Sequence, residues 1–149
     1  MEKDNSISVI IPLYGNFDVK RALLSIESIK IQEGVEVEII VSEQGEKGRL
    51  PEVEGVKHIF TYHKPQPNLS DFNPGKIRNI AILNSTKDFI YTTDADIIFS
   101  DPHYLKKVLT ILKKDSNKVL YRPFMRRLPL DNFDKFSSWC ASLGFEKAL

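Results

Sequence analysis

The sequence has only one cysteine, Cys140, and no long apolar run. A single cysteine excludes a framework of internal disulfide bonds and fits a reducing compartment. Residues 1–6 are polar, and no apolar segment behind them is long enough for a signal peptide or a membrane span. We therefore expect a cytoplasmic protein without a membrane span.

Charge of one sign is not in excess either. The chain carries 21 basic and 20 acidic residues, which gives a formal net charge of +1 at pH 7. This balance provides no general attraction to nucleic acid or to an anionic membrane, so we expect no nucleic-acid partner. A small basic cluster at Arg122, Arg126 and Arg127 leaves peripheral membrane association or an anionic acceptor open, although a solvated edge is the simpler interpretation.

The 149 residues are about the length of one domain, and the sequence has no internal repeat or low-complexity tract. Apolar β-branched runs alternate with stretches of helical period, which is typical of βαβ units and of a mainly parallel sheet. Strands are expected at residues 7–13, 35–42, 56–62 and 118–124, and within the run 88–99. We therefore predict a single α/β domain that spans residues 1–149.

Helices are expected between these strands. Asp18 is a good N-cap for the first helix, which should end near Gly34. The apolar stripe that this helix should bury consists of Val19, Leu23, Ile26 and Ile29. Each of the next two helices starts with a capping residue followed by proline, a common arrangement at helix N-termini. These helices are expected from Asn73-Pro74 to about Leu83 and from Asp101-Pro102 to Leu112, and a last one from Asp131 to Gly144.

Two carboxylates, Asp94 and Asp96, follow the apolar start of the run 88–99. In open α/β sheets, ligands bind outside the carboxyl ends of the strands, so we expect these side chains at the rim of the sheet. Hard oxygen donors suit Mg²⁺ or Mn²⁺, which complete their coordination with water and phosphate oxygens. A turn acid and a helix-capping acid are the plain alternative, and the local sequence leaves both interpretations open.

Four segments together resemble a known family. In chain order they are SVIIPLY at residues 8–14, VEIIVSEQG at 37–45, GKIRNIA at 75–81 and TDAD, an Asp-x-Asp motif, at 93–96. The order and spacing resemble the N-terminal, nucleotide-binding part of a family 2 glycosyltransferase with the GT-A fold. The resemblance covers residues 7–99 well and loosens through residue 120. It implies a mostly parallel, Rossmann-like sheet flanked by helices, with the acceptor-binding half of the family's domain largely absent.

The resemblance implies a nucleoside pocket at the end of the first strand. The main chain from Pro12 through Leu13 to Tyr14 would line it, and Tyr14 would offer a ring face to the base. A tyrosine that simply covers the sheet edge is the alternative. Glu43 stands where the family usually has an aspartate that accepts from the imide N–H of uracil, a task that suits an acceptor-only group.

The resemblance also assigns the phosphate end of the site. Arg78 corresponds to a basic position whose planar cation contacts the diphosphate, with an exposed, solvated side chain as the alternative. Asp94 would bind the ribose hydroxyls or reach the ion through water, with Ala95 beside it in the nucleotide-sugar site. Asp96 would ligate the Mn²⁺ or Mg²⁺ ion that bridges the two phosphates.

The implied function is a metal-dependent, inverting sugar transfer. The donor would be a nucleotide diphosphate sugar, with UDP expected, and the acceptor a hydroxyl of a saccharide or a lipid-linked molecule in polysaccharide or glycoconjugate synthesis. The general base is not identified, because Asp131, Asp134 and Glu146 are acidic residues without a convincing motif.

Two alternatives stay open. In a haloacid-dehalogenase-like phosphatase, an apolar strand also ends in Asp-x-Asp, so that Asp94 would be the nucleophile and Asp96 the acid/base. That pattern continues with a small residue and threonine, whereas Ile97 and Ile98 follow here. The second alternative is a catalytically silent module that binds a nucleotide sugar, because function resides in a site and not in a scaffold.

Overall fold

The computed structural model describes residues 5–64 and 72–114 of the chain. The expected strand at 118–124, the expected helix after Asp131, the arginine cluster at 122–127 and the acidic residues 131, 134 and 146 lie outside this part. The described elements are β1 (Ser6–Tyr14), α1 (Val19–Lys30), β2 (Glu36–Gly45), β3 (Val56–Tyr62), α2 (Pro74–Leu83), β4 (Ile90–Thr92) and α3 (Tyr104–Lys114). None of these helices is long and apolar enough to cross a membrane.

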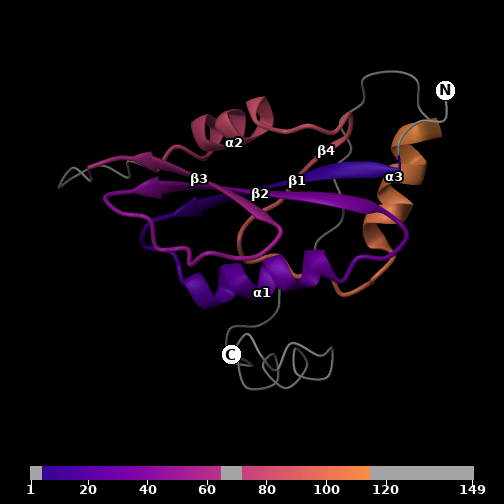
Figure 1. The fold of residues 1–149 in the computed structure, drawn as a ribbon, viewed down its shortest axis with the longest axis horizontal. Coiled ribbons are helices and arrows are strands. Elements are labelled where there is room, and N and C mark those ends of the chain that lie inside the picture. The colour runs from indigo at the N-terminus through magenta and orange to yellow at the C-terminus, as the bar shows by residue number, and fades with distance from the viewer. Residues whose placement is uncertain (1–4, 65–71, 115–149) are drawn as a thin grey trace.

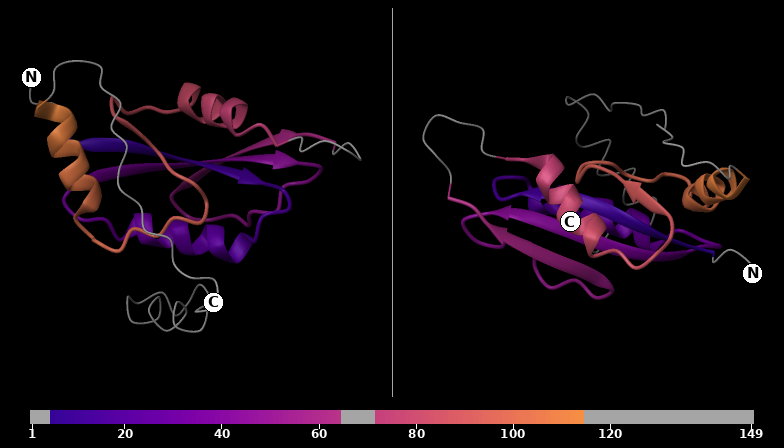
Figure 2. Two further views of the ribbon diagram at one scale, coloured as in Figure 1. Left: turned by 180° about the vertical axis from the view of Figure 1, so that it is seen from behind. Right: turned by 90° about the horizontal axis from the view of Figure 1, so that it is seen from above.

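The four described strands form one parallel sheet in the order β3-β2-β1-β4. Figure 1 shows α2 over one face of this sheet and α1 under the other, and Figure 2 shows the same arrangement from behind. Eight of the nine residues of β1 are buried, as expected for a central strand that is covered on both faces. The predicted α/β fold with a parallel sheet flanked by helices is therefore confirmed.

Alternation along β1 and β2 assigns their side chains to the two faces. Ile11 and Val41 pack in the large core on the side of α1, whereas Ile10 and Ile40 pack against Ala81 of α2. Successive side chains of a strand point to opposite faces. Residues 12, 14 and 44 therefore share the face of α2, and residues 13 and 43 share the face of α1.

The predicted N-caps of the first two helices are confirmed. The Asp18 carboxylate accepts a hydrogen bond from the backbone N–H of Lys20 at 3.0 Å. Asn73 Oδ1 accepts from the N–H of Lys76 at 2.9 Å, and Pro74 occupies the first turn of α2. Each cap satisfies a backbone donor that has no partner inside its helix.

The apolar stripe of α1 is only partly as predicted. Ile26 and Ile29 are fully buried, but Val19 and Leu23 are only partly buried. The helix ends at Lys30, and Gly34 forms the turn into β2 with a φ of 70°, a conformation that favours glycine. The buried face of α1 is wider than one stripe because the helix packs against both the sheet and the chain that follows β4.

Two expected boundaries are wrong. β2 continues to Gly45, so Glu43 lies inside a strand and does not open the following loop. The run 88–99 contributes only the three residues of β4, because the last bond to the sheet is from Thr93 N–H to Ile10 O at 3.0 Å. The backbone carbonyl of Asp94 then accepts a hydrogen bond from Ile97 N–H at 3.2 Å, and this bond closes a turn. Asp94 and Asp96 therefore stand on a turn beyond the strand.

Glu38 on β2 holds the loop between α2 and β4, and this contact predicts an acid-dependent part of the stability. Its carboxylate accepts from the hydroxyl of Ser8 at 2.5 Å and from the N–H and hydroxyl of Thr86 at 2.9 and 3.0 Å. Partial burial raises the pKa of Glu38, but these hydrogen bonds and the charge of Lys57 outweigh it, so the pKa is lowered from 4.5. The stabilisation is complete above pH 4.5 and is lost as the pH falls through the lowered pKa.

The variant Glu38→Gln tests this link. Its free energy of unfolding should fall less steeply than that of the wild type when the pH is lowered from about 7 to about 3, because the variant has no carboxylate to protonate. Urea denaturation at each pH provides the measurement. Parallel profiles for the two proteins would contradict the assignment.

Candidate functional site

A cavity of about 300 Å³ lies at the carboxyl end of β1. The walls come from the end of β1, the loop before α1, the start of α2 and the turn after β4. The residues that line it are Pro12, Tyr14, Phe17, Phe72, Pro74, Arg78, Asp94, Ala95 and Asp96. Six of these were predicted from the sequence as site residues: Pro12, Tyr14, Arg78, Asp94, Ala95 and Asp96. The cavity thus lies where parallel sheets bind ligands.

Arg78 and Asp94 meet across the cavity. Arg78 Nη2 on α2 donates to Asp94 Oδ1 on the turn after β4 at 2.5 Å, and the Arg78 side chain is 32% exposed. Arg78 is therefore not a freely solvated cation. The charged residues that line the cavity are one arginine and two aspartates, so their net charge is negative. A bare diphosphate would be repelled, and a divalent cation would remove this repulsion.

The carboxylates fit a cation that is shared with a substrate. Asp96 is exposed, and within the described residues it makes no hydrogen bond or ion pair. In residues 5–64 and 72–114, no group of three or more His, Cys, Asp or Glu side chains is placed to hold a metal ion alone. Mg²⁺ and Mn²⁺ need only one or two carboxylates when phosphate oxygens and water complete the coordination. Asp94 and Asp96 are the residues that would hold such an ion.

The other side of the cavity is aromatic. The rings of Tyr14 and Phe72 lie with their centroids 5.1 Å apart and tilted by 39°, and Phe17 adds a second phenylalanine to the wall. Such faces suit the flat surface of a nucleobase or of a sugar. Neither phenylalanine was predicted from the sequence. The available signal is that each occupies a loop beside a polar helix cap, which is too common to identify a site.

Two predicted residues lie under the cavity and do not line it. The side chains of Leu13 and Glu43 are 1% and 0% exposed. Glu43 accepts hydrogen bonds from the backbone N–H groups of Arg49 at 2.8 Å and Leu50 at 3.3 Å, and its Oε2 lies 2.8 Å from His58 Nε2. The role of Glu43 in base recognition stays a prediction, and so does the contact of the Leu13 main chain with the nucleoside.

Two buried serines of α1 hold the chain that carries the carboxylates. This carboxylate segment, residues 93–103, has no regular secondary structure. Ser25 Oγ donates to Ile97 O at 2.8 Å, and Ser28 Oγ accepts from Phe99 N–H at 3.1 Å. Both serines are 0% exposed, and each bond satisfies a backbone group of the segment.

Gln32, just beyond α1, ties down the far end of the carboxylate segment. Its Nε2 donates to Asp101 O at 2.9 Å, and its Oε1 accepts from Leu105 N–H at 2.9 Å. The Asp101 side chain is bound separately: a hydrogen bond from Lys107 and one from the His103 N–H lower its pKa. The segment is therefore fixed at both ends.

An aromatic contact joins β4 to α3 behind the site. The hydroxyls of Tyr91 and Tyr104 are 3.0 Å apart, and both rings pack with Phe99. Burial, and then the hydrogen bond with Tyr104, raises the pKa of Tyr91 far above its usual value. Tyr91 therefore stays neutral and serves packing.

The histidines do not join the cavity. His103 is exposed, and its Nε2 lies 3.8 Å from Glu33 Oε2. His58 contacts Glu43 on the α1 face of the sheet. None of the three histidines, His58, His63 and His103, is among the residues that line the cavity. The described part of the chain therefore supplies only carboxylates as ligands at the site.

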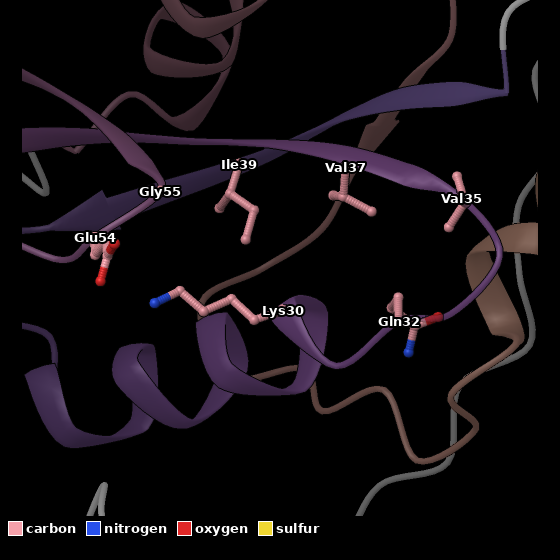
Figure 3. Close-up of a pocket in the computed structure, with 7 residues that line it drawn as sticks. All are labelled: Lys30, Gln32, Val35, Val37, Ile39, Glu54 and Gly55. Atoms are coloured by element: carbon pink, nitrogen blue, oxygen red, sulfur yellow. The ribbon is translucent and has the colours of Figure 1, made fainter.

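A second cavity, of about 360 Å³, lies between α1 and β2. Figure 3 shows Val35, Val37 and Ile39 directed toward α1, with Lys30 and Glu54 together at one end. Gln32 and Gly55 complete the lining. Aliphatic and polar residues share its walls, and it lacks the aromatic faces and the paired carboxylates of the cavity at β1.

The fold and the cavity define an α/β protein with an open cavity at the carboxyl end of a parallel sheet. The sequence model of Glycosyl transferase family 2 matches residues 8–140, and the chain belongs to this family. This assignment agrees with the predicted family and removes the haloacid-dehalogenase alternative. The chain is also 30% identical over 100 residues to an "Uncharacterized glycosyltransferase" of Rickettsia felis (strain ATCC VR-1525 / URRWXCal2), covering 64% of the chain. It spans 15% of the length of that relative.

Solved structures with a similar fold include S. aureus TarS. The TM-score is 0.56 at 18% identity, over 84% of this chain and 23% of TarS. For TarS 1-349 the TM-score is 0.56 at 18% identity, and for TarS 1-349 in complex with UDP it is 0.54 at 17%. Each of these two matches covers 86% of this chain and 39% of the other. The likeness confirms the GT-A fold.

Proposed function

We propose that this chain provides the donor site of a metal-dependent, inverting glycosyltransferase that uses a UDP-sugar. The proposal rests on one observation: Arg78, Asp94 and Asp96 line the same cavity as Tyr14 and its aromatic neighbours. One end suits a diphosphate with its cation, and the other suits a nucleobase. The TarS 1-349 structure, which has the same fold, was solved with UDP, and this supports UDP as the nucleotide.

The phosphate end is formed by Arg78, by the N-terminus of α2 and by the carboxylates. Arg78 can donate to a phosphate oxygen from the same guanidinium that binds Asp94. Pro74 at the start of α2 lines the cavity, so the positive end of the helix dipole lies beside the bound anion. Mn²⁺ or Mg²⁺, held by Asp94 and Asp96, would neutralise charge on the departing diphosphate.

The nucleoside end is formed by Pro12, Tyr14 and Phe72. We assign the base to the ring faces of Tyr14 and Phe72, and the ribose or sugar to the stretch near Asp94 and Ala95. In a UDP-sugar the diphosphate joins the nucleoside to the sugar, so in this arrangement the bond that breaks lies on the side of the diphosphate away from the aromatic wall.

The acceptor is a hydroxyl of a saccharide or of a lipid-linked molecule. In an inverting reaction this oxygen attacks the anomeric carbon from the side opposite the diphosphate. The new glycosidic bond forms as the bond to the diphosphate breaks, and a carboxylate takes the hydroxyl proton. We assign no residue to this base.

A thermal-shift panel tests the donor class. UDP, GDP, dTDP and CMP are each added with and without Mn²⁺, because a ligand that binds the folded state raises the melting temperature. With UDP and Mn²⁺ at about 100 times the dissociation constant, the shift should be about 8 °C, and it should fall sharply without the ion. No shift with any nucleotide would refute the proposal, and a shift for UDP that is equal without the ion would refute its metal dependence.

The silent binding module is the second candidate, because the chain spans 15% of its Rickettsia relative and 23% of TarS. Both candidates bind UDP. Only the transferase should release UDP slowly from a UDP-sugar in the absence of an acceptor, since water can replace the attacking hydroxyl. Chromatography of the UDP released over hours distinguishes the two candidates, and the release measured with Asp96→Ala gives the background rate.

A further inference from the structure

Glu43 is a fully buried carboxylate that the donor cavity does not use. It lies on the α1 face of β2, whereas Tyr14 lies on the α2 face. Three donors surround it: the backbone N–H groups of Arg49 and Leu50, and the ring of His58. The carboxylate thus fixes the middle of the loop between β2 and β3, because burying it without these bonds would be costly.

The side chain of Arg49 extends from this fixed loop to the loop between β1 and α1. Its Nη1 donates to Gly15 O at 2.6 Å and lies 3.5 Å from Phe17 O. Arg49 is exposed and is not among the residues that line the donor cavity. The guanidinium therefore acts on the backbone of the neighbouring loop.

That loop forms one wall of the donor cavity. It begins at Tyr14 and includes Phe17, and both side chains line the cavity. Two backbone bonds hold its start: Gly15 N–H donates to Gln44 O at 2.8 Å, and Phe17 N–H donates to Tyr14 O at 2.8 Å. The carbonyls of Gly15 and Phe17 take no part in these two bonds and accept from Arg49.

We propose that Arg49 is a positioning residue for donor binding and that Glu43 acts through it. Glu43 holds the backbone of Arg49, and Arg49 holds the loop that carries Phe17 at the nucleoside end of the cavity. The inference rests on the proposed function. It differs from a direct contact between Glu43 and the base, because the carboxylate already has three donors and has no exposed surface.

The first test compares two charge-removing variants of the same loop. Arg49→Ala should weaken binding of UDP with Mn²⁺ by about tenfold in calorimetry, the usual scale for losing a charged hydrogen bond that orders a site. Lys47→Ala is the control, because Lys47 is exposed on that loop and its loss changes the net charge equally. It should stay within about twofold. Arg49→Lys keeps a positively charged donor group at this position and should retain part of the affinity.

The second test separates positioning from base recognition. In Glu43→Gln, the positioning role predicts an equal loss of affinity for UDP and CDP, about tenfold each. A direct contact with the imide of uracil predicts a loss for UDP alone, since a glutamine amide can donate to cytosine. A changed ratio of UDP to CDP affinity, or an Arg49→Ala variant that behaves like Lys47→Ala, would overturn the proposal.

A readout without nucleotide keeps the inference separate from the proposed function. Amide hydrogen exchange at Gly15 and Phe17 should be about tenfold faster in Arg49→Ala than in the wild type and in Lys47→Ala. If the wild type binds no nucleotide, the proposed function fails, and this exchange measurement alone decides whether Arg49 fixes the loop. Unchanged exchange would then refute the tether.

Discussion

Asp96→Ala is expected to lower the affinity for UDP in the presence of Mn²⁺ by about 100-fold or more while the protein stays folded. Asp96 is exposed on the turn after β4 and has no bond to other described groups, so its removal costs little stability. The remaining carboxylate, Asp94, is already bound to Arg78. Residues that only hydrogen-bond to a metal ligand already contribute about 10- to 100-fold to metal affinity, so a direct ligand should contribute at least as much.

Calorimetry with UDP, with and without Mn²⁺, provides this measurement. Asp88→Ala is the matched control, because Asp88 is an exposed carboxylate just before β4 and outside the cavity. It removes the same charge and should leave the affinity within about twofold. Without the ion, wild type and Asp96→Ala should bind UDP equally weakly. Ion-dependent binding that survives in Asp96→Ala would place the cation elsewhere.

Features that depend on neighbouring residues were predictable from the sequence. The caps Asp18 and Asn73 were identified because a short polar side chain reaches a backbone N–H two or three residues ahead. The apolar, β-branched run of β1 identified a strand covered on both faces. The position of Asp94 and Asp96 followed from the rule that the carboxyl ends of parallel strands meet at one edge.

The missing parts of the site depend on contacts between distant segments. Phe72 meets Tyr14 across 58 positions of the chain, and Arg49 reaches Gly15 across 34. No local pattern marks such partners. Glu43 was placed in a loop because the strand pattern weakens after Ser42, yet the ladder with β1 continues to residue 44. Because successive strand residues point to opposite faces, the extension of β2 past Ser42 places the Glu43 carboxylate on the α1 face of the sheet.

The polar residues of α1 were missed for a different reason. Helical periodicity identifies the stripe that faces the sheet, and Ser25 and Ser28 are not apolar. Both are buried because the carboxylate segment packs on the helix and presents unpaired backbone groups to it. Two sequence features together would suggest such a contact: short polar side chains beside the apolar stripe of a helix, and an irregular apolar segment elsewhere in the chain. They would not identify which residues meet.

Gln32→Leu should therefore lower the free energy of unfolding by about 2 kcal/mol, because a buried backbone donor loses its partner and an unsatisfied group of this kind costs about 1–3 kcal/mol. This donor is Leu105 N–H, at the start of α3, whereas Asp101 O keeps the hydrogen bond from Tyr104 N–H at 3.0 Å. Leucine has a similar size, so the change isolates the hydrogen bonds from a loss of volume. The melting temperature should fall by about 6 °C.

The control for this variant is Lys20→Leu, which adds the same side chain at an exposed position in the first turn of α1 and should change stability by less than about 0.5 kcal/mol. Urea denaturation of both proteins gives the comparison. If Gln32→Leu were as stable as the control, the backbone of the segment would have to be satisfied by other groups. The carboxylate segment would then owe its position to Ser25 and Ser28 of α1, to the bond from Thr93 to β1 and to Arg78, and not to Gln32.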